Sequence, residues 1–251
     1  MSRVSRMTAA SACDGRLAAV SAYPARAVVD LAAVRDNVAS LVDRSGSAQV
    51  LAVVKADGYG HGLVPSARAA LAGGATWLGT AQVDEALALR AAGVQAPLLT
   101  WLYAPGAPFD AALTAGIDLS VAAPWALEEV LAAVRRTGVP ARLHVKVDTG
   151  LGRNGVMPSA LPELLDAALT AEAEGACAVV GLWSHLAWAD APDHPTVLGQ
   201  ATVFDEAVAL AERMGAHLEV RHLANSAATL TNPAMHYDLV RPGLAVFGLS
   251  P

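Results

Sequence analysis

Residues Val53 to Gly62 read VVKADGYGHG, and the interpretation of the whole chain starts from this stretch. An apolar run, Val50 to Val54, delivers a single amine, Lys55, into a glycine-rich turn, and helix is expected again after Pro65. Three glycines in the turn can take positive φ and approach a ligand closely: Gly58, Gly60 and Gly62. A buried strand that ends in a lysine and a tight turn is suited to hold a reactive nitrogen.

Lysine is used sparingly in this chain. Of the 17 Lys+Arg residues, only Lys55 and Lys146 are lysines, and both end apolar runs (LAVVK and RLHVK) where an ammonium is costly to desolvate. An amine whose pKa falls on burial makes a Schiff-base nucleophile, which a guanidinium does not. The alternative is that each lysine is a buried ion-pair partner, because unpaired lysine is rarely buried.

Composition bounds the class of protein. At 251 residues, 54% hydrophobic and 16% charged, the chain can bury a sizeable core and is not disordered. The net charge of −6 argues against a nucleic-acid or acidic-membrane partner. Cys13 and Cys177 are isolated, so neither a disulfide framework nor a zinc site is predicted. Without a run of about 18 apolar residues or a secretory signal, we expect a cytoplasmic enzyme.

Residues 26 to 251 predict a (β/α)8 barrel with parallel strands, preceded by a mobile leader over residues 1 to 25. Apolar runs alternate with alanine-rich helical stretches, a pattern typical of parallel strands buried on both faces. The runs are Gln49–Lys55, Trp77–Ala81, Pro97–Leu102, Ile117–Ala122, Arg142–Thr149, Ala178–Leu186, His217–Asn225 and Tyr237–Arg241. A doubly wound open sheet is the alternative, but it has fewer repeats and would need a GxGxxG turn after its first strand.

Single residues in the sequence also predict where some strands and helices begin or end. Arg26 to Leu31 is expected to be a short strand, and Asp30 is expected to cap a helix with apolar positions at helical spacing. Later helices are expected to end at three glycines, Gly93, Gly138 and Gly215.

Polar residues gather where the apolar runs stop. Barrel active sites lie at the carboxyl ends of the strands, so these positions are the candidates for chemistry. In chain order they are Lys55, Tyr59, Lys146, Asp148, Arg153, His185, Asn225, Ser226 and Arg241.

The decapeptide VVKADGYGHG resembles the pyridoxal-phosphate attachment motif of alanine racemases, and HVKVDTGLGRNG (His144 to Gly155) resembles a second segment of that family. The resemblance implies a fold-type III barrel in which Lys55 forms an aldimine with pyridoxal 5'-phosphate. It implies catalytic roles for Lys55, Lys146, Arg153 and His185. It implies cofactor contacts from Lys55, Tyr59, Trp101, Arg153, His185, Asn225, Ser226, Arg241, Gly243 and Leu244.

The resemblance also suggests individual roles. Lys146 is the counterpart of a lysine that is carbamylated in many members, and it would orient Arg153, which meets the cofactor O3′ and the substrate carboxylate. An Asp148–Arg153 ion pair that stiffens the loop is the alternative. His185 would lie against the pyridine ring and hydrogen-bond the arginine at the ring nitrogen, Arg241. A histidine satisfied in the core is the alternative there.

The phosphate is expected at the loops after the last two strands. By the resemblance, its ligands are Ser226, Gly243, Leu244 and Tyr59. Independently, Ser226 sits at the start of a helix, and Pro242 suits the first position of a short helix. Asp190, Asp193 and His194 lie around Pro192 and Pro195 and are interpreted as part of a solvated loop, and no metal is predicted.

The function implied is interconversion of L- and D-alanine, which supplies D-alanine for peptidoglycan, by a homodimer. Family members carry a second, mostly β domain whose tyrosine acts from the partner subunit on the other face of the substrate. The resemblance covers about residues 26 to 251 and none of that domain. We therefore expect this chain to bind the cofactor weakly and to racemise alanine slowly or not at all, and we expect the strand at Arg26 to be poorly paired or dangling.

Other functions are compatible with the same pattern. A barrel racemase for serine or a bulkier amino acid, or a decarboxylase, would differ in the size of the pocket. A non-catalytic pyridoxal-phosphate-binding barrel has a fitting length but a different lysine turn. A metal-dependent hydrolase with carbamylated Lys146 would need a His-x-His pair where Lys55 stands, so this alternative is set aside.

Overall fold

The computed structural model describes residues 25–251, and the predicted leader lies outside these residues apart from its last position. An eight-stranded parallel sheet forms the centre, with neighbours in the order β7-β6-β5-β4-β3-β2-β1-β8. The strands are β1 (Gln49–Val53), β2 (Trp77–Thr80), β3 (Leu98–Thr100), β4 (Asp118–Val121), β5 (Ala141–Lys146), β6 (Cys177–Trp183), β7 (Val220–His222) and β8 (Leu239–Val240). Each lies within or overlaps its predicted apolar run, so the barrel prediction is confirmed and the open-sheet alternative is wrong.

The barrel closes between β7 and β8, the two ends of the strand order. The Asp238 amide donates to the Arg221 carbonyl at 3.1 Å, and the Arg241 amide donates to the Ala224 carbonyl at 2.9 Å. Between these bonds, the Asp238 carboxylate accepts from the backbone amide and from the side chain of Arg221. A side chain therefore replaces part of the backbone ladder at this seam.

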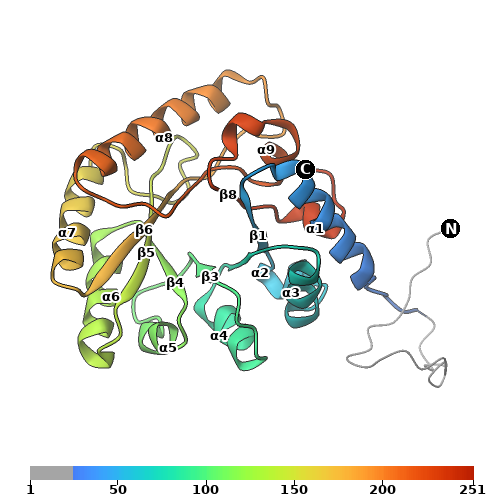
Figure 1. The fold of residues 1–251 in the computed structure, drawn as a ribbon, viewed down its shortest axis with the longest axis horizontal. Coiled ribbons are helices and arrows are strands. Elements are labelled where there is room, and N and C mark those ends of the chain that lie inside the picture. The colour runs from blue at the N-terminus through green and yellow to red at the C-terminus, as the bar shows by residue number, and fades with distance from the viewer. Residues whose placement is uncertain (1–24) are drawn as a thin grey trace.

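Helices surround the sheet (Figure 1). They are α1 (Leu31–Ser45), α2 (Lys55–Tyr59), α3 (Leu63–Ala72), α4 (Val83–Ala91), α5 (Phe109–Thr114), α6 (Pro124–Thr137), α7 (Leu161–Ala173), α8 (Pro195–Arg213) and α9 (Ser226–Thr231), with 3-10 turns η1 (Pro233–Met235) and η2 (Leu244–Phe247). Helix α3 begins at Leu63, two residues before Pro65, whereas it was predicted to begin after Pro65.

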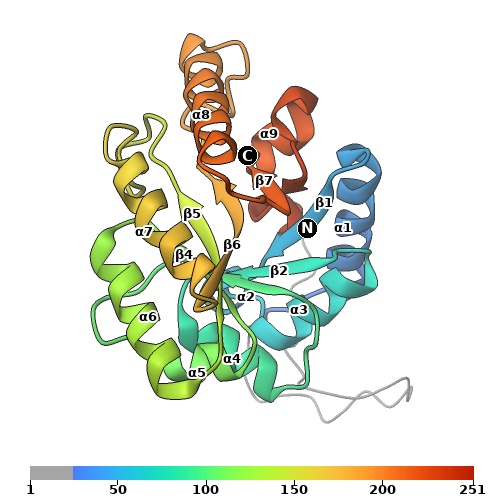
Figure 2. The same cartoon turned by 60° about the vertical axis from the view of Figure 1, so that its left-hand side comes forward.

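The first helix packs against elements from both ends of the chain. Helix α1 packs against α3 on one side and against α9 and η2 on the other, so that the blue and red ends of the ribbon lie side by side in both views (Figures 1 and 2). The Asn37 side-chain amide donates to the Val246 carbonyl at 3.2 Å. Gly73 allows the contact with α3, because a Cβ there would meet the Arg35 carbonyl at 2.4 Å. The outer ring is therefore completed by a helix from the start of the chain.

The segment before α1 differs from its prediction. Residues 25–30 form no strand, so the strand expected from Arg26 is wrong. Leu31 already belongs to α1, and the Asp30 carboxylate accepts from the amides of Ala32 and Ala33 as predicted for a cap.

The helix ends are close to those expected. Gly138 is the left-handed C-cap of α6, as predicted. Gly93 and Gly215 take positive φ one residue beyond the C-caps of α4 and α8, which are Ala92 and Met214. The glycines therefore reverse the chain after the helix rather than close its last turn.

Two layers of apolar side chains fill the molecule. A large core lies between the sheet and the helices and includes the fully buried Phe204. A smaller cluster fills the barrel interior, formed by Leu51, Val53, Trp77, Leu99, Val220 and Leu239. The interior also holds buried polar side chains, among them His144 and His222, which lie beside this cluster and below the carboxyl ends of the strands.

Candidate active site

The turn that carries Lys55 is left-handed. Gly58, Gly60 and Gly62 have φ values of 62°, 83° and 93°, which confirms the positive φ predicted for them. Ala56 and Asp57 also take positive φ, at 53° and 52°, a conformation that costs an L-residue about 1–2 kcal/mol. Strain of this kind persists only where the surroundings enforce it, and it is common at functional sites.

Carboxylates hold this turn in place. Glu85, in the first turn of α4, accepts a hydrogen bond from the Ala56 amide. The Asp57 carboxylate accepts from the Leu63 amide at 2.7 Å and so joins the turn to the start of α3. Glu85 was missed by sequence reasoning, because its position in α4 is also explained by a simple helix capping box.

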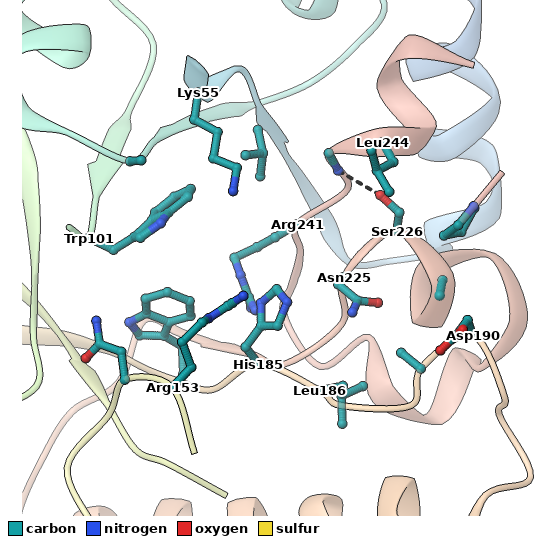
Figure 3. Close-up of a pocket in the computed structure, with 18 of the residues that line it drawn as sticks. Lys55, Trp101, Arg153, His185, Leu186, Asp190, Asn225, Ser226, Arg241 and Leu244 are labelled. Carbon is teal, nitrogen blue, oxygen red and sulfur yellow. Dashed lines mark hydrogen bonds between the residues drawn. The ribbon is translucent and has the colours of Figure 1, made fainter. Parts of the chain in front are cut away.

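A cavity of about 620 Å³ opens at the carboxyl ends of the strands. Figure 3 shows the side chains of Lys55, Arg153, His185 and Arg241 directed into this space. Every residue assigned above to catalysis or to the cofactor lines the cavity: Lys55, Tyr59, Trp101, Lys146, Arg153, His185, Asn225, Ser226, Arg241, Gly243 and Leu244. The fold therefore brings together residues that are spread over 190 positions of the sequence.

Positive charge dominates the cavity. Burial first, and then the charge of Arg153, lowers the pKa of Lys55, while Glu85 opposes the change. Burial, Arg241 and Arg153 lower the pKa of Lys146 to about 8. Burial and the surrounding cations lower the pKa of His185 to about 3, so this imidazole is neutral at pH 7. Such a site favours anions and makes both lysines more nucleophilic than they would be in water.

Arg241 is a buried cation, with 5% of its surface exposed. Its guanidinium donates to the Ser184 carbonyl at 2.6 Å, to the Leu223 carbonyl at 3.2 Å and to His222 Nδ1 at 3.1 Å. The partner expected from the resemblance was His185, and in this structure the imidazole that accepts from Arg241 is that of His222. The reason is that His222 ends β7 next to the closing seam, whereas His185 lies two residues beyond β6 and faces the cavity.

Trp183, the last residue of β6, lies under two of the cations. Lys146 Nζ is 4.5 Å and the Arg241 guanidinium carbon is 4.7 Å from its ring, close enough for cation–π attraction. The His222 ring stacks on the same indole with a centroid distance of 5.5 Å and an interplanar angle of 3°. Sequence reasoning did not single out Trp183, because an aromatic residue at the end of an apolar run is most simply a core residue.

The loops after β7 and β8 gather hydrogen-bond donors around one hydroxyl. The Ser226 hydroxyl accepts from the Gly243 amide at 2.8 Å and from the Ala245 amide at 3.3 Å. Gly243 leaves room for Tyr59, since a Cβ would lie 2.3 Å from the Tyr59 hydroxyl. These amides and hydroxyls form a donor-rich cradle of the kind that binds anions.

These loops agree with one prediction and differ from another. Ser226 is the first residue of α9, as predicted, and the cap before it is Asn225, whose side-chain oxygen accepts from the Ala228 amide. The short helix after β8 begins at Leu244, so Pro242 precedes it instead of opening it. In both cases the glycine or asparagine between the strand and the helix makes the turn.

The loop of Arg153 is ordered by an aspartate that does not pair with it. Asp148 Oδ1 accepts from the amides of Gly150 and Gly152 at 2.9 and 3.1 Å. Among residues 25–251, no salt bridge joins Asp148 to Arg153, so the predicted alternative of a stiffening ion pair is wrong. Arg153 is exposed and reaches over the cavity (Figure 3).

The loop before α8 forms part of the cavity rim. Trp188 and Asp190 line the cavity, although this segment was interpreted as a solvated loop. His194 caps α8 by accepting from the Thr196 amide, and its ring stacks on Trp188 at 4.4 Å. The part of the chain that the structure describes contains no group of three His, Cys, Asp or Glu side chains placed to hold a metal ion.

A parallel barrel with a lysine after its first strand, a cationic cavity and a donor cradle after its last two strands defines the class of barrel proteins that hold an anionic ligand at the strand ends. Within this class, the chain belongs to the alanine racemase family. Residues 29–251 match the family model described as alanine racemase, N-terminal domain.

Individual relatives agree with this assignment. The alanine racemase of Beutenbergia cavernae is 64% identical over 229 residues, which are 91% of this chain and 61% of the relative. That of Frankia casuarinae is 61% identical over 225 residues, 90% of this chain and 59% of the relative. The crystal structure of alanine racemase from D-cycloserine producing Streptomyces lavendulae superposes with a TM-score of 0.88 at 53% identity, over 89% of this chain and 58% of that one. The chain thus spans about 61% of the length of the first relative.

Proposed function

We propose that this chain is the cofactor-binding barrel of an alanine racemase and that it holds pyridoxal 5'-phosphate in the cavity of about 620 Å³. The observation that carries the proposal is the meeting of Lys55, the Ser226–Gly243 cradle and Arg241 around one space. The relatives described above are alanine racemases, so they do not favour the serine racemase or the non-catalytic carrier.

The residues fit the cofactor at three points. The amides of Gly243 and Ala245 and the hydroxyls of Ser226 and Tyr59 would bind the phosphate. Lys55 supplies the amine for covalent attachment, and its lowered pKa leaves more of it neutral at pH 7. Arg241 would donate to the ring nitrogen, with Trp101, His185, Asn225 and Leu244 as the remaining contacts.

When bound, pyridoxal phosphate supplies an electron sink that acidifies the α-hydrogen of an amino acid. Lys55, which lines the cavity, would remove or return that proton on its own side. Arg153, which is exposed above the cavity and free to form a forked pair, binds the substrate carboxylate. Burial lowers the pKa of Arg241 to about 9, so it stays a cation that gives a hydrogen bond at pH 7 without giving up its proton.

Lys146 is proposed as the site of a carbamate. It lies between Arg241 and Arg153, and its pKa of about 8 leaves a fraction of neutral amine at pH 7. The neutral amine attacks CO2, a C–N bond forms, one proton leaves to water, and the lysine becomes an anion. The new charge would pair with Arg153 and reduce the repulsion in the cavity. Carbon-13 NMR in labelled bicarbonate should show one carbamate signal that Lys146→Gln abolishes.

The decisive experiment uses the scarcity of lysine. The purified chain is incubated with pyridoxal phosphate and reduced with borohydride, and its peptides are mapped by mass spectrometry. We expect the label on Lys55, none on Lys146, and loss of the absorbance of the bound cofactor in Lys55→Ala. A folded protein that carries no label at Lys55, or carries it equally at both lysines, would disprove the proposal.

The substrate and the assembly belong to the same proposal. We infer alanine as the substrate and a homodimer as the form of the whole protein, and we infer the cytoplasm as its location. Exposed apolar side chains at the cavity mouth, Leu102, Trp188 and Leu244, support a second subunit there. Among residues 25–251, no helix has the length and apolar composition needed to cross a membrane. Light scattering during size-exclusion chromatography tests the dimer, and a monomer at all concentrations would contradict it.

A further inference from the structure

A line of hydrogen-bonded side chains runs from Arg241 through the barrel interior to the start of β4. Arg241 Nη1 lies 3.1 Å from His222 Nδ1, and His222 Nε2 lies 2.9 Å from His144 Nδ1. His144 Nε2 lies 3.2 Å from Asp118 Oδ2. All four residues are at most 5% exposed, and they come from four strands or strand ends, β8, β7, β5 and β4. We call these four residues the Arg241–Asp118 line.

The Arg241 guanidinium determines which ring nitrogen of His222 and of His144 carries the proton. A guanidinium only donates, so His222 Nδ1 has to accept, and its proton lies on Nε2. His222 Nε2 then donates to His144 Nδ1, which places the proton of His144 on its own Nε2. His144 donates in turn to the Asp118 carboxylate, which only accepts. Burial, together with the charge of Arg241, lowers the pKa of His222 well below its usual value, which agrees with a neutral ring.

Neighbouring polar groups do not compete for the two imidazoles. The Trp183 indole N–H donates to the Ser120 hydroxyl at 2.9 Å, and the Trp77 indole N–H donates to the Gln49 side-chain oxygen at 3.0 Å. Gly181 provides the space for His144, because a Cβ there would lie 2.3 Å from His144 Nδ1. The indole N–H groups beside the two histidines therefore have other acceptors and do not hydrogen-bond to the imidazoles.

The carboxylate end of the line is anchored as well. Asp118 lies 3.2 Å from Arg142 Nε, and the same guanidinium forms two bonds with Glu219, at 3.0 and 2.8 Å. Arg142 therefore fixes the position of Asp118, and both carboxylate oxygens act as acceptors. The line has a donor that cannot accept at one end and an acceptor that cannot donate at the other, so only one direction of hydrogen bonding is possible along it.

We propose that Asp118, His144 and His222 are positioning residues that hold the Arg241 guanidinium in a single orientation toward the cavity. Asp118 sets the direction of every hydrogen bond in the line. The link to the cofactor rests on the proposed function, whereas the direction of the hydrogen bonds is a property of the chain itself. Without the Asp118 charge, His144 is free to move its proton to Nδ1. His222 would then turn a donor toward Arg241, and the orientation of the guanidinium would be lost.

The first test needs no cofactor. Long-range proton–nitrogen correlation spectra of protein labelled with 15N-histidine report which ring nitrogen carries the proton. We expect His144 and His222 to be neutral rings protonated on Nε2, and assignment by single His→Gln variants identifies them. A proton on Nδ1 of either ring, or a charged imidazolium at pH 7, would overturn the proposal in the unsubstituted protein, whatever the fate of a variant.

A variant pair tests the role of Asp118. Asp118→Asn removes the charge at the end of the line, and Asp110→Asn removes the charge from another aspartate–arginine pair, with Arg136, on the surface. Asp118→Asn should abolish the single protonation pattern of both histidines, and it should weaken pyridoxal-phosphate binding by about ten-fold, the equivalent of one charge-assisted hydrogen bond. Asp110→Asn should change neither. Unchanged histidine spectra in a folded Asp118→Asn protein would refute the positioning role.

The outcomes separate this proposal from the proposed function. If both rings are protonated on Nε2 and pyridoxal phosphate fails to label Lys55, the line stands and the racemase proposal fails. If Lys55 is labelled while either ring is protonated on Nδ1, the racemase proposal stands and the line is wrong.

Discussion

Substitution of Glu85 is the most direct test of the turn that carries Lys55. The Glu85 carboxylate accepts the Ala56 amide from the left-handed turn, and it accepts the amides of Ala81 at 3.0 Å and Gln82 at 3.1 Å at the start of α4. One side chain thus holds both the strained turn that carries Lys55 and the beginning of the neighbouring helix. Glu85→Ala removes all three acceptor contacts.

The size of the effect follows from these contacts. Loss of the bonds at the start of α4 costs about 1 kcal/mol, as for other helix caps. The bond from Ala56 to a charged acceptor contributes about 2 kcal/mol. The free energy of unfolding should therefore fall by about 3 kcal/mol, and the Tm by about 6–12 °C for a chain of this size.

The same substitution should change the reactivity of Lys55. Glu85 raises the pKa of Lys55 against the lowering by burial and by Arg153, so its removal lowers that pKa further. Labelling of Lys55 by an amine reagent, followed by mass spectrometry across a pH series, should shift to lower pH. Lys146 serves as a reference within the same sample.

Two variants complete the design. Glu85→Gln keeps an acceptor oxygen but removes the charge, so it should shift Lys55 labelling with a smaller loss of stability. Asp84→Ala removes a neighbouring exposed acidic residue from the same first helical turn. If Glu85→Ala unfolds within about 0.5 kcal/mol of Asp84→Ala, or if Lys55 labelling moves to higher pH, the reasoning about this turn is wrong.

Three further predictions concern other parts of the site. The pKa of His185 is lowered to about 3 and that of His222 lies well below its usual value, so below pH 6.5 the unfolded chain binds protons that the native chain does not. The free energy of unfolding should therefore fall as the pH is lowered, by about 1.4 kcal/mol per pH unit for each histidine. Chemical denaturation between pH 6 and pH 4.5 should show this slope, and His185→Asn should reduce it by about half; an unchanged slope would contradict the assignment. Gly181→Ala places a Cβ 2.3 Å from His144 Nδ1 and should destabilise by about 2–3 kcal/mol, whereas Gly199→Ala, with open space around it in α8, should stabilise by up to about 1 kcal/mol; equal urea midpoints for the two would be evidence against the packing argument. Gly243→Ala displaces the Tyr59 hydroxyl from the donor cradle and should weaken pyridoxal-phosphate binding about ten-fold in an absorbance titration, and full affinity would exclude Gly243 from the phosphate site.

The barrel could be predicted from the sequence because buried parallel strands appear as regularly spaced apolar runs. These runs are longer than the strands they contain. The run from His217 to Asn225 contains a strand of only three residues, β7, because the rest of it turns into the loop that reaches the cavity. The residues that end each run were identified for the same reason, since the ends of parallel strands meet at one edge.

The parts that sequence reasoning missed depend on partners distant in the chain. Nothing in the types of Ala56 and Asp57 signals a left-handed backbone, which exists because Glu85 and the start of α3 hold it. His144 and His222 lie 78 positions apart and look like isolated residues in apolar runs. Their connection appears only when β5 and β7 are placed on either side of β6. Side-chain pairs across a sheet follow from the order of strands, which a local pattern does not contain.

The position of α1 against η2 has a consequence for biosynthesis. The Asn37 side chain finds its acceptor, the Val246 carbonyl, 209 residues later in the chain. At about 5–20 residues per second on the ribosome, the side of this helix that packs against η2 stays uncovered for roughly 10–40 seconds before η2 is made. We therefore expect the nascent chain to depend on chaperone binding near α1, and any translational pause between α1 and β8 to lengthen that dependence.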